Sequence, residues 1–507
     1  MRGNWEPGIG LLLFLFLFLL CHLQVTFSTE TTLRNGTTAS WRSGAARRSA
    51  KATCSQRFLP EILPPPATCP PEILSLGGTV YILYDVNISE GFNLRRDVYI
   101  RLAVFVRRLQ KLQRNRRRFR NVRLVLPPWP RLYHWHSQGL QQDDGLPWSH
   151  FFDLDSLRRY APVLDYEEYL AEQRLFGQPG APLIHVAHAF RLQHYEVMLE
   201  QGHFRDKFER IADQPCSESA RSGGPLLLHR RELRVGRFHC VRFQGSAGLL
   251  EQLLLQAIDE DTAGEEDAQD MRSFVLLSAE TVLHDHWGDE HFWRARRSMR
   301  FARRLQQVAD DFRRQVLATT ASSAGVQRPV MWELERGKRN ARGGDYLCAH
   351  LRRGDFVRSR EATTPTLKAA AQQVKQLLRA YNMTTVFLAS DATPYELMEL
   401  KELFQRSFRF VHFAPESNGQ RRELKDGGVA VVDQLVCAYA RYFVGTYEST
   451  FTYRIYEERE ILGFSQASTF NTFCKALGGS CSRNAVWPIV WDAQGDGDGD
   501  ESEEDPY

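Results

Sequence analysis

The second half of the chain alternates short apolar runs with amphipathic stretches, and this alternation restricts the fold more than any other feature of the sequence. Strands are predicted at residues 346–351, 386–389, 408–411 and 442–444. Helices are predicted between them, at residues 367–381, 395–404 and 428–440. A chain that alternates strand and helix in this way builds a parallel sheet with helices on both faces.

The first half begins with the same kind of unit. Residues 80–86 (VYILYDV) read as a buried strand, and residues 122–126 as a second strand. The helix between them has its apolar residues at helical spacing: Val98, Leu102, Phe105, Leu109 and Leu112. Residues 127–300 look less regular, with loops near 216–224 and 259–270, before a helix at 301–317. We therefore predict an α/β protein with two Rossmann-like domains, at 79–300 and 301–491, facing a cleft.

The two ends of the chain differ from this pattern. The apolar run 11–21 follows Arg2 and predicts a signal peptide at residues 1–28, with an uncleaved anchor at 8–27 as the alternative. Residues 29–78 are rich in Ser, Thr, Arg and Pro, which predicts a disordered arm. Residues 492–507 predict an acidic disordered tail, whose removal should leave the activity intact.

The cysteines fit an oxidising compartment, because eight of the nine lie outside the signal peptide. Closeness in sequence suggests three disulfides: Cys54 with Cys69, Cys216 with Cys240, and Cys474 with Cys481. Cys348 and Cys437 lie in apolar elements, where we expect buried thiols. Glycosylation triplets begin at Asn35, Asn87 and Asn382.

The charge of the chain is unevenly distributed. The formal net charge is +4, but residues 492–507 hold eight acidic and no basic residues, so the remainder carries +12. A basic body favours an anionic partner. The basic run 114–123 would suit nucleic acid, but lumenal targeting argues against that partner and favours a solvated helix end.

The turns that follow the predicted strands are where a parallel sheet binds its ligands. The first of these turns holds Ser89, Glu90, Gly91, Phe92 and Asn93. Gly91 permits a tight turn, and Glu90 delivers a carboxylate to the mouth of the site. The alternative is that Glu90 is an ordinary solvent-exposed residue of a turn, which would give the same sequence pattern.

The strand at 346–351 ends in the strongest cluster of candidate residues. His350 and Arg352 share one face of the strand, with Leu351 between them, and a guanidinium group binds phosphate oxygens in a bidentate manner. The alternative is a surface arginine pair, Arg352 and Arg353, balanced by Asp355.

Two more candidates lie near the last strand. Ser449, Thr450 and Phe451 open the helix that follows it, and the free amides of a helix start attract anions, although ordinary capping would use the same residues. Asp433 could accept hydrogen bonds from a base or a ribose, or be an ordinary acidic helix residue.

We expect no metal site. His284 and His286 flank an aspartate near Glu290 and His291, but no helical spacing fixes their geometry. The Asp-any-Asp pattern at 259–261, which metal-dependent sugar transferases use, lies in a polar stretch that reads as a surface loop.

Longer motifs carry a resemblance that covers residues 79–491. They are LYDVN at 83–87, EGFNLRRD at 90–97, LPPW at 126–129, LHDH at 283–286, HLRR at 350–353 and KDGG at 425–428. Together they resemble the GDP-fucose protein O-fucosyltransferases, specifically the class that modifies thrombospondin type 1 repeats. The His-any-Arg-Arg element recurs across several fucosyltransferase groups, and the Glu-Gly-Phe-Asn turn is typical of the protein-modifying branch.

The resemblance implies a GT-B fold and inverting transfer of fucose, in the endoplasmic reticulum lumen, from GDP-fucose to Ser or Thr of folded thrombospondin type 1 repeats. It implies no metal or other cofactor, and we expect a monomer that binds no nucleic acid. Glu90 matches the catalytic base of the family. Asp355 and Glu458 match its supporting acidic positions, and Ser449 is expected to support the donor site. The donor contacts it implies are Ser89, Glu90, Gly91, Phe92, Asn93, His350, Leu351, Arg352, Asp433, Thr450 and Phe451.

Two other functions remain open. A fucosyltransferase that acts on glycans would share the donor site, and a non-catalytic lumenal protein could hold folded repeats. Ser89 stands where the family usually has proline, which creates the triplet at Asn87. Since a glycan there would obstruct the site, we predict that Asn87 is unmodified.

Overall fold

The first described strand begins at residue 79, next to the apolar run 80–86 that predicted it. The structure, a computed structural model, describes residues 79–492 apart from 114–120, 131, 133–134, 136–144, 177–183, 194–209, 214–215, 217–225, 230, 245–246, 263–271, 282–287, 406 and 479–480. The predicted signal peptide, arm and tail beyond Asp492, the Cys54–Cys69 pair, His284 and His286 lie outside these residues, as does most of the basic run.

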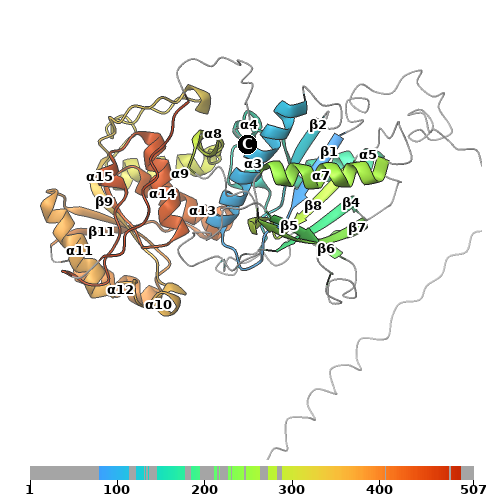
Figure 1. Cartoon of the computed structure of the whole chain (residues 1–507). Helices are drawn as coiled ribbons and strands as arrows, with labels where there is room; N and C mark the ends of the chain where they lie inside the picture. Colours follow the sequence, from blue (N-terminus) through green and yellow to red (C-terminus); the bar gives the residue numbers. More distant parts are fainter. Residues whose placement is uncertain are drawn as a thin grey trace, which may run out of the picture. The chain divides into compact units, whose positions relative to one another are not determined.

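The first sheet has the strand order β3-β2-β1-β8-β4-β7-β5, with β6 paired to β7 (Figure 1). Its strands are β1 (Thr79–Tyr84), β2 (Asn121–Leu126), β3 (Val163–Asp165), β4 (Ile184–Gln193), β5 (Arg210–Asp213), β6 (Leu226–Leu228), β7 (Arg231–Gln244) and β8 (Arg272–Leu277). All pairs from β3 to β7 are parallel, and only β5 and β6 join β7 in the antiparallel sense.

Side chains from alternate positions of β1 enter two different cores, so both faces of this sheet are covered. Ile82 and Tyr84 pack with α3 (Phe92–Gln113) and α7 (Ala247–Thr262). Tyr81 and Leu83 pack with α5 (Tyr166–Phe176) on the other face. The shorter helices of this half are η2 (Trp148–His150), α4 (Leu154–Arg158), η3 (Ala279–Thr281) and α8 (Glu290–Ser298).

The second sheet has four parallel strands in the order β11-β10-β9-β12. Its strands are β9 (Gly344–Leu351), β10 (Thr385–Ser390), β11 (Arg409–His412) and β12 (Ala440–Val444). Its helices are α9 (Arg303–Val316), η4 (Trp332–Leu334), α10 (Phe356–Ser359), α11 (Leu367–Ala380), α12 (Pro394–Phe404), α13 (Asn418–Ala438), α14 (Thr450–Leu462) and α15 (Gln466–Thr469). This order is that of half a Rossmann fold.

The strand β9 again divides its side chains between two cores. Tyr346 and Cys348 pack with residues of α13, and Leu347 and Ala349 pack with residues of α11. His350 follows on the α13 side because strand side chains alternate. The predicted α/β class with two Rossmann-like units, the GT-B arrangement, is confirmed. The cleft and the domain boundary at residue 300 stay predictions.

Three expectations about the described residues were wrong. The stretch 127–300 is regular, since it holds six of the strands and both α5 and α7, and residues 259–262 end α7 instead of forming a loop. Cys348 and Cys437 form a disulfide between β9 and α13 (Cα–Cα 5.1 Å). Closeness in sequence could not reveal this pair, because the fold joins residues 89 positions apart. The Cys216–Cys240 and Cys474–Cys481 pairs are confirmed.

The predicted tail boundary also moves. Asp492 belongs to the folded part, because both of its carboxylate oxygens accept hydrogen bonds from Arg297 Nη2 (3.0 and 2.9 Å) and one accepts from Arg294 Nε (2.7 Å). The described residues, between 79 and 492, all belong to one compact unit. No helix among the described residues has the length and apolar character needed to cross a membrane.

Candidate active site

The carboxyl ends of β9 and β12 form the first part of the site. Strand order reverses between these two strands, and a parallel sheet binds ligands at such a switch point. Thr446, just after β12, joins the two strand ends: its hydroxyl donates to His350 O (3.0 Å) and accepts from Arg352 N (2.8 Å). The two turns predicted as separate candidates are thus brought together.

His350 is a buried and neutral member of this site. Its Nδ1 lies 2.7 Å from Thr452 Oγ1, and its ring stacks on Phe451 at 4.4 Å between centroids. Burial, and then the charge of Arg352, lowers the pKa of His350 to about 3. It therefore acts as a hydrogen-bonding group in this site and does not carry a positive charge at neutral pH.

Arg352 is held by two carboxylates. Its Nη2 donates to Asp355 Oδ1 (2.6 Å), and its Nη1 donates to Asp391 Oδ2, from the residue after β10. Burial raises the pKa of Asp391, and Arg352 acts against this rise. The fork is thus oriented before an anion arrives. Asp355 was predicted as supporting, whereas Asp391 was missed.

The start of α14 lies beside these groups. Ser449 is the N-cap residue, with an extended backbone (φ −82°, ψ 121°), and its side chain makes no capping hydrogen bond. The Ser449 hydroxyl therefore does not cap the helix, which was the alternative interpretation. Thr450 and Phe451 occupy the first turn, whose unpaired amides are suited to an anion.

Asp433 lies on α13, on the same side of the sheet as His350. Its Oδ1 is buried and has no hydrogen-bond partner among the described residues, and burial raises its pKa well above the ordinary value. A buried carboxylate oxygen without a partner is costly unless a ligand binds it. This observation favours a ligand contact over an ordinary helix-face residue.

The first sheet contributes the second part of the site, where strand order reverses between β1 and β8. The Glu90 turn follows β1 and is braced by Arg95, which is 5% exposed. Arg95 Nε donates to Glu90 O (3.0 Å), while its Nη2 donates to the carbonyls of Val86 (3.0 Å) and Asn87 (2.9 Å). Arg95 therefore fixes the turn from both sides.

Glu90 is half-buried at this turn. Its pKa is raised, mainly by burial and also by the negative charge of Glu280, while Arg95 acts in the opposite sense. A carboxylate with a raised pKa is a better proton acceptor than an exposed one, which suits a general base.

The other residues of the turn are placed in different ways. The Phe92 ring is buried among aromatic rings such as Trp129 (4.7 Å) and Phe151 (5.1 Å), and the Leu351 side chain is buried in the second core. Both can offer only backbone atoms to a ligand. Ser89 N and Oγ donate to Asn87 Oδ1 (3.1 Å each). Gly91 lies beside Glu90, and Arg95 N donates to its carbonyl (3.1 Å).

Asn93 connects the two halves of the site. Its Oδ1 accepts from Gln434 Nε2 (2.8 Å) on α13 and from Arg96 Nη1 (3.3 Å), and Arg96 Nη1 also donates to Gln434 Oε1 (2.8 Å). Gln434 adjoins Asp433, so the Glu90 turn and the Asp433 helix are tied by direct hydrogen bonds.

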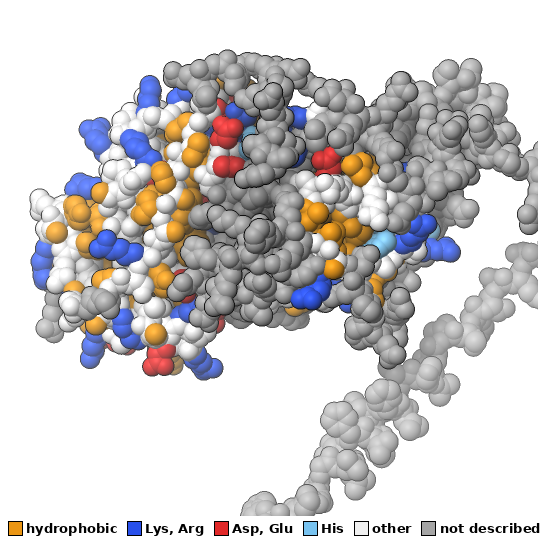
Figure 2. Space-filling model, in the orientation of Figure 1, with side chains coloured by type: hydrophobic (Ala, Val, Ile, Leu, Met, Phe, Trp, Pro, Cys, Tyr) orange, Lys and Arg blue, Asp and Glu red, His pale blue; other side chains and the backbone are white. Residues whose placement is uncertain are grey.

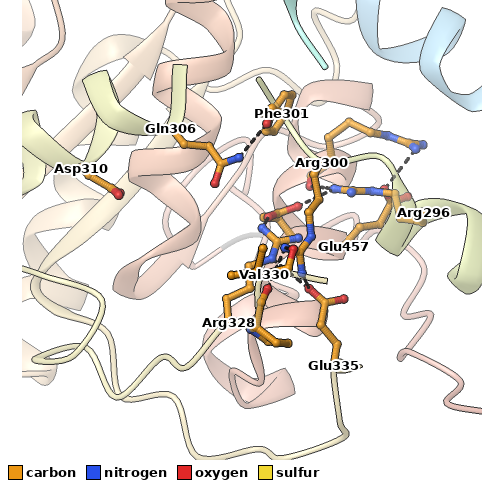
Figure 3. Close-up of polar contacts among 12 residues, drawn as sticks. Arg296, Arg300, Phe301, Gln306, Asp310, Arg328, Val330, Glu335 and Glu457 are labelled. Atoms are coloured by element: carbon orange, nitrogen blue, oxygen red, sulfur yellow. Dashed lines mark hydrogen bonds and ion pairs between the residues drawn. The ribbon is translucent and has the colours of Figure 1, made fainter. Parts of the chain in front are cut away.

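Glu458 lies on α14 and belongs to a buried charge network, of which Figure 3 labels Arg296, Arg328 and Glu457. Arg296 on α8 donates to Glu458 Oε2 (2.9 Å) and Glu457 Oε2 (2.7 Å), and Arg328 donates to Glu458 Oε1. Despite burial, these arginines hold the pKa of Glu458 down at about 2. Glu458 therefore supports the site by anchoring the helix that carries Ser449.

The described residues contain no group of three or more His, Cys, Asp or Glu side chains placed to hold a metal. On the face shown in Figure 2, the Lys and Arg side chains of the second unit are scattered over the surface. On this face the positive side chains do not gather into one patch, and the candidate site is defined by the particular placement of Arg352.

Polar groups at the switch points of two Rossmann-like units are typical of enzymes that bind a nucleotide ligand. Residues 81–462 match the model of the GDP-fucose protein O-fucosyltransferase family, and the chain belongs to this family. It is thus a glycosyltransferase.

Two known proteins of similar sequence agree with this family. The chain is 79% identical to a Drosophila melanogaster GDP-fucose protein O-fucosyltransferase 2 over all of both chains. It is 39% identical to the Homo sapiens protein of that name, over 81% of this chain and 90% of the other. A crystal structure of POFUT1 with GDP-fucose aligns with a TM-score of 0.46 at 15% identity, covering 80% of this chain and 99% of that one.

Sequence reasoning gave no role to four residues of the site: Arg95, Glu280, Asp391 and Gln434. Asp391 and Glu280 each follow a strand, at residues 385–390 and 272–277, so a search of every strand end would have found them. Arg95 and Gln434 lie inside helices, where nothing in the sequence distinguishes them from other polar residues.

Proposed function

We propose that the protein transfers fucose from GDP-fucose to Ser or Thr hydroxyls of folded thrombospondin type 1 repeats, with inversion and without a metal, as a monomer in the endoplasmic reticulum lumen. The observation that carries the proposal is the Glu90 turn. A carboxylate of raised pKa lies at one switch point, and an arginine fork lies at the other. The three disulfides are consistent with an oxidising compartment.

In this mechanism Glu90 accepts the proton of the acceptor hydroxyl, and the oxygen of that hydroxyl attacks the anomeric carbon of fucose. The bond from that carbon to the phosphate oxygen breaks on the opposite face, and its electron pair leaves with GDP. A β-linked donor then gives an α-linked product. Arg352, released from Asp391 or Asp355, and the amides of α14 would stabilise the charge on the departing diphosphate.

His350 and Asp433 have separate roles in binding the donor. His350 is neutral and its ring stacks on Phe451, so it can offer a hydrogen bond to the donor without adding a positive charge to the site. The unpartnered Asp433 Oδ1 would accept from the base or the ribose.

The test offers labelled GDP-fucose to three acceptors, with chelator present throughout: a folded thrombospondin type 1 repeat, the same repeat reduced, and a glycan. We expect transfer to the folded repeat only. Transfer to the glycan would favour the glycan-directed enzyme, and binding of the repeat without transfer would favour the non-catalytic protein. Loss of activity in chelator would refute the metal-free mechanism.

Two variants test the assigned roles. Glu90→Ala should abolish transfer and leave GDP binding unchanged, because a general base acts on the acceptor hydroxyl and not on GDP. Arg352→Ala should weaken both GDP binding and transfer, since it removes a charge-assisted contact with the diphosphate. Glu423→Ala, on the exposed start of α13, is the matched control. Full activity of either site variant would contradict its assignment.

A further inference from the structure

The end of β8 brings a second carboxylate to the Glu90 turn. Glu280 lies in η3, directly after the strand that pairs with β1, and the two strand ends are joined by Asp85 N to Leu276 O and Ala279 N to Asp85 O (2.9 Å each). The Glu280 side chain is half-buried. The fold thus delivers two glutamates to a single switch point, from adjacent strands.

Glu280 makes a specific contact with the turn. Its Oε2 accepts a hydrogen bond from the backbone N–H of Asn87 (3.2 Å). The carbonyl of the same residue accepts from Glu90 N (2.9 Å) and from Arg95 Nη2 (2.9 Å). The peptide groups around Asn87 are therefore held from the β8 side by Glu280 and from the α3 side by Arg95.

Glu280 is itself fixed in place. Its backbone carbonyl accepts from Arg101 Nη1 (3.3 Å), and Arg101 pairs with Asp97 (3.1 Å) on the same helix. The turn that carries Glu90 is therefore clamped between two anchored residues of opposite charge, Glu280 and Arg95. A carboxylate that accepts a backbone N–H would be enough to hold the turn, but the negative charge of Glu280 also acts on Glu90.

We propose that Glu280 is a positioning residue for the transfer reaction: it orients the Glu90 turn through the Asn87 amide, and its negative charge strengthens Glu90 as a base. This inference rests on the proposed function. The pKa of Glu90 is consistent with it, because after burial the charge of Glu280 is the next cause of the rise. Removing that charge while keeping the hydrogen bond should make Glu90 a weaker base.

Other charged groups also lie around the turn, and they do not change when Glu280 alone is replaced. Arg95 acts on Glu90 with the opposite sign; Asp85 and Glu280 also act on Arg95, and Asp97, Glu280 and Arg454 act on Arg101 of the same helix. His229, on the turn after β6, has its pKa lowered to about 4 by burial, so it is uncharged above pH 5. These groups are the same in a variant that alters Glu280 alone.

The experiment measures kcat/KM for fucose transfer to a folded repeat from pH 5 to pH 9. In Glu280→Gln the amide oxygen can still accept from Asn87, so we expect the acidic limb of the profile to move to lower pH. Glu280→Ala also releases the turn, and we expect about a tenfold to hundredfold loss of kcat with GDP affinity unchanged. Glu168→Gln is the matched control, because Glu168 also accepts a backbone amide, from Asp165 (2.9 Å).

The outcomes separate the two proposals. A wild-type chain without transfer activity would refute the proposed function itself. An active wild type, with Glu280→Gln giving the same pH profile and the same rates as wild type, would refute the role of Glu280. A fall in kcat for Glu280→Gln without movement of the acidic limb would refute the effect of the charge. Circular dichroism and GDP binding of each variant establish that the fold is kept.

Discussion

Replacing Glu458 by glutamine tests whether the buried charge network supports the donor site. Arg296 and Arg328 bind the two oxygens of Glu458 separately, and the Glu458 side chain is 4% exposed. The glutamine keeps the shape of the side chain and removes the charge. Each arginine retains one other carboxylate, Glu457 for Arg296 (2.7 Å) and Glu335 for Arg328 (2.9 Å), so the fold should survive the change.

The magnitude follows from the change in pKa. The folded protein holds the pKa of Glu458 at about 2, against an ordinary value of 4.5. A difference of 2.5 units at 1.36 kcal/mol each corresponds to about 3 kcal/mol of folding free energy at neutral pH. Breaking a buried ion pair typically costs about 3 to 5 kcal/mol, which agrees.

The pH dependence has a definite sign. Because the folded pKa is depressed, this stabilisation is fully present above pH 4.5 and is lost as the pH falls toward 2. The difference between wild type and Glu458→Gln should therefore shrink from about 3 kcal/mol at pH 7.5 to about 2 kcal/mol at pH 3.5.

Urea unfolding of purified wild type, Glu458→Gln and Glu423→Gln at both pH values measures this difference. Glu423 pairs with Arg304 at the surface (3.7 Å), so its variant should lose at most about 1 kcal/mol. If Glu458→Gln unfolds at the same urea concentration as the control at pH 7.5, the network does not stabilise the fold and the reasoning is refuted. GDP affinity of the folded variant then reports whether α14 has moved.

Two further predictions concern the ends of the folded region and the turn. A chain ended after residue 495 should keep its activity and its stability, whereas Asp492→Asn in the full chain should lose about 1 kcal/mol, because it weakens the contacts with Arg294 and Arg297. Equal melting temperatures for Asp492→Asn and wild type would contradict this. Active protein from a secretory host should carry no glycan at Asn87, as glycopeptide mass spectrometry would show; a glycan there in active enzyme would overturn the assignment of the neighbouring site.

Local apolar patterns in the sequence predicted most of the fold. The apolar run that begins at residue 80 and the alternation after residue 344 have the lengths and spacings of β1 and of β9 to β12, and the structure places strands there. The region 127–300 was harder because its strands are interrupted by polar residues. In β4 (IHVAHAFRLQ) and β7 (RELRVGRFHC and four more residues), charged and imidazole side chains break the apolar runs on which the prediction depended.

The site shows the same division between local and long-range information. Glu90, His350, Arg352 and Ser449 could be selected because each lies at or after the end of a strand, and strand ends meet at one edge of a parallel sheet. Their orientation depends on partners far away in the sequence: Asp391 for Arg352, Glu280 for the Glu90 turn, and Gln434 for Asn93. Only the strand order decides which of the many polar residues become these partners.

The two switch points also explain why the carboxylates of this site differ in their chemistry. Glu458 lies between arginines that keep it ionised, Asp433 is buried without a counter-charge, and Glu90 lies between Arg95 and a like charge. A base must exchange a proton near the working pH, which a carboxylate with a pKa of about 2 cannot do, and burial raises the pKa of Asp433 with no charge acting against the rise. Of these three acids, only Glu90 has an environment whose opposing effects leave it available for proton transfer.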